Sequence, residues 1–343
     1  MRFGPVPLAE ATGAILAHSV PAVRVPHAMG RTYRISKGAI LGAAELADIA
    51  AAGLDEVWIA RPGPQEVGED VAALRIARAL AAGDPGWDLS EAATGRVNLR
   101  AAHAGVVRLD AAAVHAVNRI DPAITVATVP PWKRLPQGGL AATVKIIPFA
   151  VSQSALAEAC AAAEGAMAMV PPAVVGATLI ETRIGSDVPP DKGRRSMITR
   201  LARLSVRLSP RVVVPHRAPA IAAALSAAPG EVLMILTASA TSDIADIAPE
   251  GLRHAGGAVD HFGMPVDPGN LLFLGRLGDK PVIGLPGCAR SPAMNGADWV
   301  LDRLLCGVPV TGPDIMAMGV GGLLKEIPER GRPRDRDARG QGA

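Results

Sequence analysis

From residue 172 onward, short apolar segments alternate with segments whose apolar residues recur at helical spacing. The alternation predicts a mostly parallel sheet with helices on both faces, because strands buried on both sides are almost continuously apolar. The turn at residues 278–280 would join the last two strands as an antiparallel hairpin. The predicted strands are residues 174–182, 211–215, 231–236, 258–263, 271–276 and 281–283, and the predicted helices are residues 191–208, 218–227, 249–255 and 291–305.

The first half of the chain is less regular and indicates an α+β or α/β arrangement. Helices are predicted at residues 8–20, 44–52, 69–82, 110–119 and 153–163, and strands at residues 56–60, 105–109, 124–129 and 140–149. A change of composition near residues 83–86 suggests a boundary. We therefore expect a smaller α+β region at residues 1–84, a middle α/β region at 85–170, a larger α/β domain at 171–312 and a disordered tail at 325–343.

Composition narrows the functional classes. Aromatic residues make up 3% of the chain, so the core must consist of Ala, Val, Leu and Ile, and few rings are present that could stack on bases. The net charge of +3 therefore suggests weak attraction to anions and no nucleic-acid partner. Neither a signal peptide nor a long apolar run is present, so we expect no membrane association and a cytoplasmic location. The three cysteines are widely spaced and suggest neither a disulfide framework nor a zinc site.

Polar residues follow the buried strand predicted at 231–236. Asp246 lies three residues before Pro249, which suits the first turn of a helix. A carboxylate at this point could hold Mg²⁺ between phosphates, or it could cap the helix, and the residues alone leave both interpretations open. The neighbouring candidates for ligand contact are Thr237, Ser239, Thr241 and Ser242.

A second candidate loop follows the strand predicted at 281–283. Its glycines would let the backbone approach a phosphate, and the guanidinium of Arg290 suits bidentate contact with an anion, although an ordinary turn with a solvated arginine is the alternative. Asp187 follows the first strand of the same region, where a plain helix start with a basic face is the alternative. His216, His254 and His261 have no metal-binding spacing and are interpreted as surface or core residues. The other residues assigned to ligand binding are Gly284, Leu285, Pro286, Gly287, Pro268 and Gly269.

These loops resemble those of a known family. Residues 237–250 resemble the Thr-Gly-Gly-Thr-Gly…Arg-Asp-Val-Thr-Pro-Glu loop of molybdopterin-binding domains, residues 263–270 its Pro-Gly loop, and residues 281–287 its Gly-Leu-Pro-Gly strand end. Residues 6–11 and 37–57 are similar to segments of molybdopterin molybdotransferases. The greatest likeness is to the molybdopterin-binding half of bacterial proteins that are fused to a cytidylyltransferase-like domain. The resemblance implies a three-layer αβα domain that holds the pterin and its phosphate, with Asp246 as the functional aspartate.

The chain also departs from the family pattern. Residues 238–242 carry side chains where the family has glycines, and Asp267 or Asn270 replaces a lysine. Two functions follow as hypotheses. The protein inserts molybdate into adenylylated molybdopterin with release of AMP and help from Mg²⁺ at Asp246, or it is a non-enzymatic carrier that delivers molybdopterin or its nucleotide form to a nucleotidyltransferase or a molybdoenzyme. A generic sugar-phosphate or nucleotide-phosphate binder is a weaker third hypothesis, and homodimerisation stays open.

Overall fold

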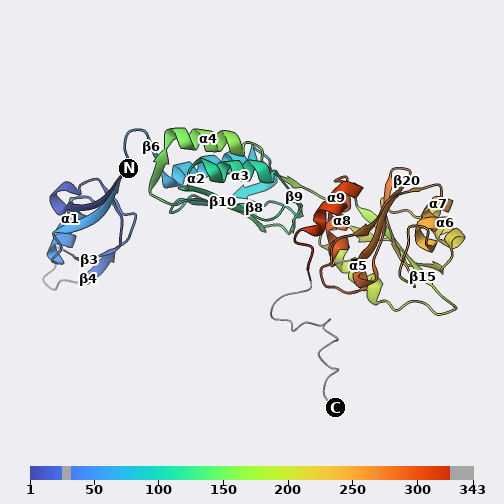
Figure 1. Ribbon diagram of the computed structural model, residues 1–343. Helices are drawn as coiled ribbons and strands as arrows, with labels where there is room; N and C mark the ends of the chain where they lie inside the picture. Colours follow the sequence, from blue (N-terminus) through green and yellow to red (C-terminus); the bar gives the residue numbers. More distant parts are fainter. Residues whose placement is uncertain (25–31, 268, 325–343) are drawn as a thin grey trace, which may run out of the picture. The chain divides into compact units, whose positions relative to one another are not determined.

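The computed structural model describes residues 1–24, 32–267 and 269–324, and its chain forms two compact units (Figure 1). Unit 1 comprises Met1–Ala102, Val107–Pro131 and Gln137–Met169, and unit 2 comprises His103–Val106, Trp132–Pro136 and the chain from Val170 onward. Both contain helices and strands, so the mixed α/β class is confirmed. In the described part of the chain, no helix is long and apolar enough to cross a bilayer. The tail predicted at residues 325–343 lies outside the described residues.

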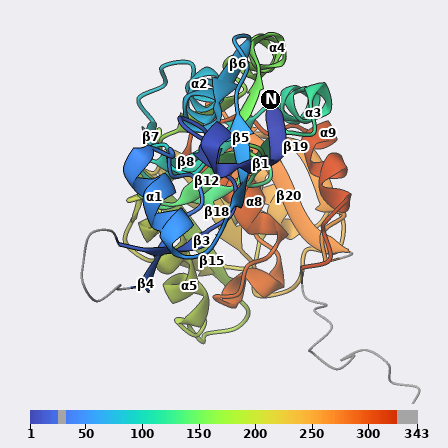
Figure 2. The same cartoon turned by 90° about the vertical axis from the view of Figure 1, so that its left-hand side faces the viewer.

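The N-terminal part of unit 1 is a small sheet of order β1-β5-β2 with a helix beside it (Figure 2). Its buried apolar residues, among them Leu16 and Ile59, form a cluster of their own. The helix predicted at residues 8–20 is wrong, because Leu16 pairs with Ile59 across the sheet and Gly13 adopts φ +73°. The elements are β1 (Arg2–Pro7), β2 (Ile15–Leu16), β3 (Val20–Val23), β4 (Thr32–Ile35), α1 (Ala43–Ala51) and β5 (Glu56–Arg61).

In the rest of unit 1, two helices pack against an antiparallel sheet of order β10-β12-β8-β7, and a third helix packs on those two (Figure 1). The helices predicted at 69–82, 110–119 and 153–163 are confirmed within one residue at each end, whereas β7 and β8 were not predicted. The elements are β6 (Glu66–Gly68), α2 (Glu69–Ala81), β7 (Trp87–Leu89), β8 (Arg96–Ala101), α3 (Ala111–Ile120), β10 (Ile124–Thr128), β12 (Leu140–Ile146), β13 (Ala150–Ser152) and α4 (Gln153–Ala163). Three further strands are β9 (Gly105–Leu109), β11 (Arg134–Leu135) and β14 (Met167–Val170).

Unit 2 is built on a sheet of order β16-β15-β18-β21-β20-β19, with β17 also paired to β15. The pairs of β15 with β16, β17 and β18, and of β18 with β21, are parallel. The pairs β20–β21 and β19–β20 are antiparallel, so the hairpin predicted at residues 278–280 is confirmed. The strands are β15 (Gly176–Arg183), β16 (Arg207–Leu208), β17 (Val212–Pro215), β18 (Val232–Leu236), β19 (Ala258–Met264), β20 (Asn270–Leu277) and β21 (Lys280–Gly284).

Two apolar clusters cover opposite faces of this sheet. Side chains alternate along a strand, so Met234 of β18 belongs to one cluster and Ile235 belongs to the other. Helices α5 and α8 contribute to the first cluster, and α6 and α7 contribute to the second. The helices are α5 (Lys192–Ala202), α6 (Ala218–Ala227), α7 (Ile247–His254), α8 (Gly296–Leu305) and α9 (Gly312–Met316). The predicted helix 191–208 therefore ends early, because residues 207 and 208 pair with β15.

Gly284 ends β21 and lies directly opposite Phe273 of β20. Phe273 is completely buried, and a Cβ atom added to Gly284 would lie 1.9 Å from its Cε1 atom. No side chain can occupy that space unless the phenyl ring moves. The glycine is therefore required by the packing of the core, independently of any ligand.

Gly284→Ala should lower the free energy of unfolding by about 3 kcal/mol, because it overpacks a filled core. Gly176→Ala is the matched control, since a Cβ atom there would meet only an ordinary contact at 3.9 Å. Urea denaturation followed by circular dichroism measures both variants. Equal midpoints for the two variants would contradict the packing argument.

Candidate functional site

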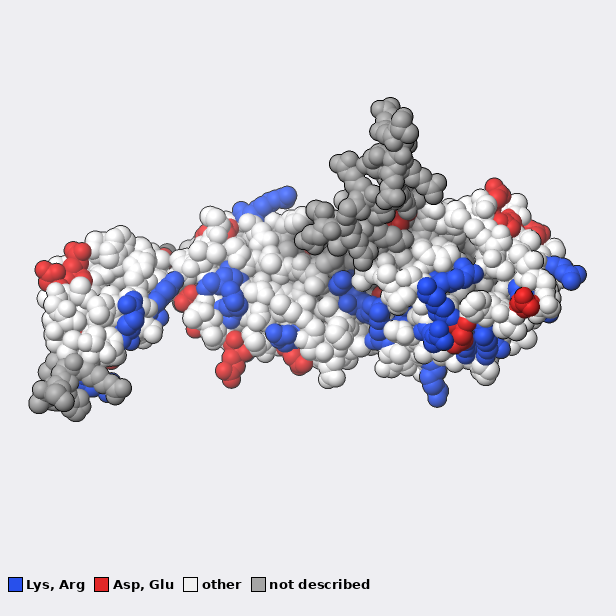
Figure 3. Space-filling model, turned by 90° about the horizontal axis from the view of Figure 1, so that it is seen from below, with Lys and Arg blue, Asp and Glu red and all other residues white. Residues whose placement is uncertain are grey.

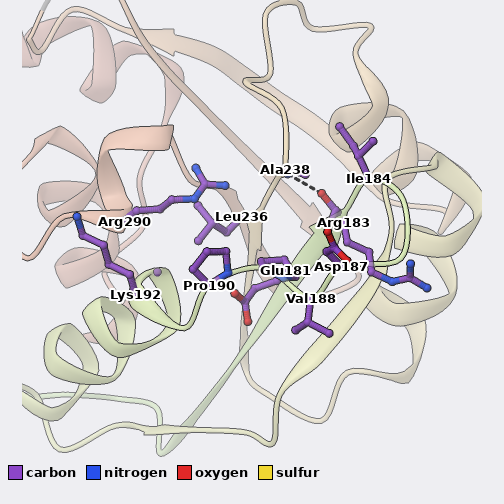
Figure 4. Close-up of a pocket in the computed structure, with 13 residues that line it drawn as sticks. Glu181, Arg183, Ile184, Asp187, Val188, Pro190, Lys192, Leu236, Ala238 and Arg290 are labelled. Atoms are coloured by element: carbon purple, nitrogen blue, oxygen red, sulfur yellow. Dashed lines mark hydrogen bonds between the residues drawn. The ribbon is translucent and has the colours of Figure 1, made fainter.

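A cavity of about 450 Å³ opens at the carboxyl ends of β15 and β18 (Figure 4). The two strands are parallel, so their carboxyl ends meet at one edge of the sheet, which is where open α/β sheets bind ligands. Residues from the end of β15, the segment before α5, the first turn of α5 and the residues after β18 form its wall, together with Arg290. We take this cavity as the candidate functional site.

One end of the cavity is cationic. Figure 4 shows Lys192 and Arg290 on the same side of it. Arg290 is oriented by a hydrogen bond from its guanidinium to the carbonyl oxygen of Thr237. The side chain of Asp191 makes no capping hydrogen bond to α5, so the positive end of the helix dipole adds to the two cations. This end of the cavity suits an anionic group.

Close packing brings the two cations together. A Cβ atom on Gly193 would lie 2.7 Å from Cδ2 of Leu236 and 3.4 Å from Cγ of Arg290. Only a glycine lets the first turn of α5 approach the end of β18 and the Arg290 side chain so closely. Gly193 carries no signal for this role in the sequence, because the role depends on residues that are distant in the chain.

The other side of the cavity combines exposed apolar side chains with charged ones. Ile184 and Val188 are 67% and 61% exposed although they are large hydrophobic residues, and both belong to the wall. Asp187 and Arg183 lie on this side, away from Lys192 (Figure 4). The cavity therefore offers apolar contact and one charge of each sign at this side, and two cations at the other.

Glu181 does not add free negative charge to the wall. Its carboxylate accepts hydrogen bonds from Nε of Arg211 at 2.8 Å and from Nη2 at 3.1 Å, and the glutamate is 2% exposed. The hydrogen bond to Glu181 raises the pKa of Arg211. Arg211 also donates to the carbonyl oxygen of Pro189 at 2.7 Å, so the pair anchors the segment before α5.

Thr182 contributes a buried hydroxyl group to the wall. Its Oγ1 atom accepts a hydrogen bond from the backbone N–H of Ala238 at 2.7 Å, drawn in Figure 4. The same oxygen lies 3.0 Å from Nδ1 of His216. His216 is half-buried, and this contact links it to a residue of the cavity wall. His216 belongs to no recognisable sequence motif, so the amino-acid sequence alone did not indicate this contact.

Asp246 is the N-cap residue of α7, which begins at Ile247 and not at the predicted residue 249. Its two carboxylate oxygens accept hydrogen bonds from the backbone N–H groups of Ile247 at 2.6 Å and Ser242 at 2.9 Å. Asp246 is not part of the cavity wall. Across the described ranges, no group of three or more His, Cys, Asp or Glu residues could hold a metal ion.

The remaining predicted residues fall into two groups, those at the cavity and those away from it. Of those assigned to ligand binding, Asp187 and Arg290 line the cavity, and Thr237 contributes through its carbonyl oxygen. Thr241 is buried, Ser239 and Ser242 are exposed, and Gly269 lies in the turn between β19 and β20 with φ +81°. Pro268 lies outside the described residues. Leu285 and Pro286 are buried and Gly287 is exposed, and none of the residues from Gly284 to Gly287 lines the cavity.

A buried arginine holds the loop that carries Arg290. Arg200 is 3% exposed, and its guanidinium donates to the carbonyl oxygens of Ala289, Ser291 and Ala293 at 3.0, 2.8 and 2.9 Å. Its Nε atom donates to the carboxylate of Asp298 at 2.6 Å. These carbonyls bind a side chain instead of helical amides, so α8 begins at residue 296 and the predicted start at residue 291 is wrong.

Positive charge extends beyond the cavity. Residues 183–211 contain eight lysines and arginines and two aspartates. Four of these cations, Lys192, Arg195, Arg203 and Arg207, are exposed. Figure 3 shows lysine and arginine side chains gathered on one face of unit 2, with few acidic side chains among them. The cavity thus belongs to a surface that attracts anions.

Arg200→Met should lower the free energy of unfolding by about 3–5 kcal/mol, because Asp298 would keep a buried charge without its partner. Arg203→Met is the control, since Arg203 is exposed at the end of the same helix and should change stability by less than about 0.5 kcal/mol. Urea denaturation measures both, and limited proteolysis should cut residues 287–295 faster in the first variant only. Identical behaviour of the two variants would show that Arg200 does not hold the loop.

Comparison with known proteins gives a match to one family model and matches to solved structures. Residues 5–61 match the model of a family described as a domain of unknown function, DUF8806. No curated protein matches the chain. The chain is similar to the crystal structure of the molybdopterin biosynthesis moea protein from Pyrococcus horikosii, with a TM-score of 0.28 and 12% sequence identity over 92% of this chain and 75% of that chain. A TM-score this low does not support a functional assignment, which must come from the residues of the site.

Proposed function

We propose that unit 2 is a three-layer αβα molybdopterin-binding domain whose cavity holds a phosphorylated pterin. The observation that carries the proposal is the polarity of the cavity, with Lys192 and Arg290 at one side and exposed apolar residues with Arg183 and Asp187 at the other. A pterin phosphate has a similar division, since its phosphate is anionic, the flat faces of its ring suit packing against apolar side chains, and the edge of its ring carries hydrogen-bonding groups. The loop sequences that resemble those of molybdopterin-binding domains support the same ligand.

The polarity suggests one orientation for the ligand. The phosphate would lie between Lys192 and Arg290, where charge-assisted hydrogen bonds are strongest. The ring would pack against Ile184, Val188 and neighbouring apolar side chains. Its pyrimidine edge, which carries an amino group and a ring N–H, would then face Asp187, whose carboxylate accepts hydrogen bonds.

The hydrogen bonds that Asp246 accepts favour the carrier hypothesis over molybdate insertion. Both carboxylate oxygens already accept backbone N–H groups, and among the described residues no acidic cluster joins the aspartate. These residues do not fit a Mg²⁺ site, so we derive no catalytic step through the ion. We propose that the protein carries molybdopterin or its nucleotide form to a molybdenum-cofactor nucleotidyltransferase or a molybdoenzyme. Insertion of molybdate into adenylylated molybdopterin, with Asp246 as its carboxylate, is the second candidate.

Lys192→Met and Arg290→Met should each weaken binding of 6-hydroxymethylpterin monophosphate by about tenfold or more, because each removes a charge-assisted contact. Arg195→Met is the control, since Arg195 lies on the same helix and is 70% exposed outside the cavity wall. Isothermal titration calorimetry measures the affinities. If all three variants bind as tightly as the wild type, the phosphate does not occupy the cationic end.

The carrier hypothesis predicts that the protein releases no AMP from adenylylated molybdopterin in the presence of molybdate and Mg²⁺. Chromatographic assay of AMP over time tests this prediction. AMP release that is catalysed by the wild type and lost in Asp246→Ala would replace the carrier with the insertion hypothesis. Asp243→Ala is the matched control, because Asp243 is an exposed aspartate of the same loop.

A further inference from the structure

Residues 184–188 form an exposed segment at the rim of the cavity, between the end of β15 and the two prolines that precede α5 (Figure 4). Its two large hydrophobic side chains, those of Ile184 and Val188, line the cavity and are nevertheless mostly in contact with water. Apolar side chains gain free energy when they leave water for apolar contact. The segment therefore gains burial only when a ligand with an apolar surface fills the cavity.

The backbone of this segment is held at its two ends and not between them. The carbonyl oxygen of Arg183 accepts the backbone N–H of His216 at 2.9 Å, and the carbonyl oxygen of Pro189 accepts a hydrogen bond from Arg211 at 2.7 Å. Among the described residues, the N–H groups of residues 184–188 donate no hydrogen bond to the backbone. A segment whose backbone is solvated and whose side chains are exposed rearranges at low cost in free energy.

The side-chain contacts of the segment are local and exposed. The guanidinium of Arg183 donates to the carbonyl oxygen of Gly185, and Oγ of Ser186 lies 3.5 Å from the carboxylate of Asp187. These contacts join near neighbours in the chain, so they do not tie the segment to the rest of unit 2. Arg183 and Asp187 also carry opposite charges, so this side of the cavity has no excess charge that would attract a phosphate. Apolar contact is therefore the interaction through which the segment responds to a ligand.

We propose that residues 184–188 form a lid that closes over a bound ligand, and that Ile184 and Val188 make closure selective for ligands that carry a flat ring beside their anionic group. An anion without a ring would bind at Lys192 and Arg290 and leave both apolar side chains in water. The inference rests on the proposed function and adds a moving segment to the cavity. Closure of a lid slows the release of a ligand, which a carrier requires between loading and delivery.

Hydrogen–deuterium exchange measured by mass spectrometry separates a lid from a fixed wall. With saturating 6-hydroxymethylpterin monophosphate, the amides of residues 184–188 should exchange at least about tenfold more slowly than in the ligand-free protein, because closure shields them from water. Saturating inorganic phosphate should leave their exchange unchanged. Unchanged exchange with the bound pterin would show a fixed wall and overturn the lid, and equal protection by inorganic phosphate would overturn the role of the ring.

A double variant tests the two apolar side chains. Ile184→Ser combined with Val188→Ser should release the pterin probe about tenfold faster in a stopped-flow displacement experiment, because the closed lid loses its apolar contact. Its affinity for inorganic phosphate should equal that of the wild type. Val175→Ser is the matched control, since Val175 is also 67% exposed and lies outside the cavity wall. Wild-type release and wild-type amide protection in the double variant would overturn the proposal.

Calorimetry of the wild type with both probes distinguishes failure of the lid from failure of the proposed function. If the pterin probe does not bind, the proposed function fails and the lid is overturned with it. If the probe binds while the amides of residues 184–188 stay unprotected, only the lid is overturned.

Discussion

The buried guanidinium of Arg200 is the interaction on which the candidate site depends. Its hydrogen bonds to the carbonyl groups of Ala289, Ser291 and Ala293 hold the chain in a non-helical conformation from residue 291 to residue 293. Its ion pair with Asp298 joins α5 to the first turn of α8, and Asp298 in turn accepts the N–H of Asn295. A buried charge is tolerated only when it is paired and fully hydrogen-bonded, so this geometry has few alternatives. The position of Arg290 at the cavity follows from it, and the Oγ atom of Ser196 also binds the Arg290 carbonyl.

The same helix sets the electrostatics of the cavity. Its first turn supplies Lys192 and the positive end of the helix dipole, which no side chain caps. The carboxylate of Glu181 is paired with Arg211, so it does not compete with an anionic ligand for the cations of the cavity. Two cations at one end therefore favour the anionic part of a ligand there. The opposite side carries one charge of each sign, Arg183 and Asp187, among exposed apolar side chains. This difference between the two ends is the basis of the orientation proposed for a phosphorylated pterin.

The loop after β18 makes contacts that position its neighbours in the fold. Thr237 orients Arg290 through its carbonyl, and Asp246 caps α7 with both carboxylate oxygens. Side chains at residues 238–242 stand where glycines would let the backbone approach a ligand. These features are the basis of the proposed carrier function, and the cavity lies beside this loop, toward β15 and α5.

The sequence by itself determined the order of most strands and helices in unit 2, although not β16 and α9, and it placed Asp187 and Arg290 at strand or loop ends, because periodicity and turn residues are local properties. It did not place the start of α8, since helical spacing cannot show that backbone carbonyls bind a distant side chain. Only the tertiary structure decided the contacts of Arg200 with Asp298 and of Thr182 with His216, which join residues 98 and 34 positions apart. Such pairs form when the sheet and its helices pack, because packing brings together polar groups that must find partners once water is excluded.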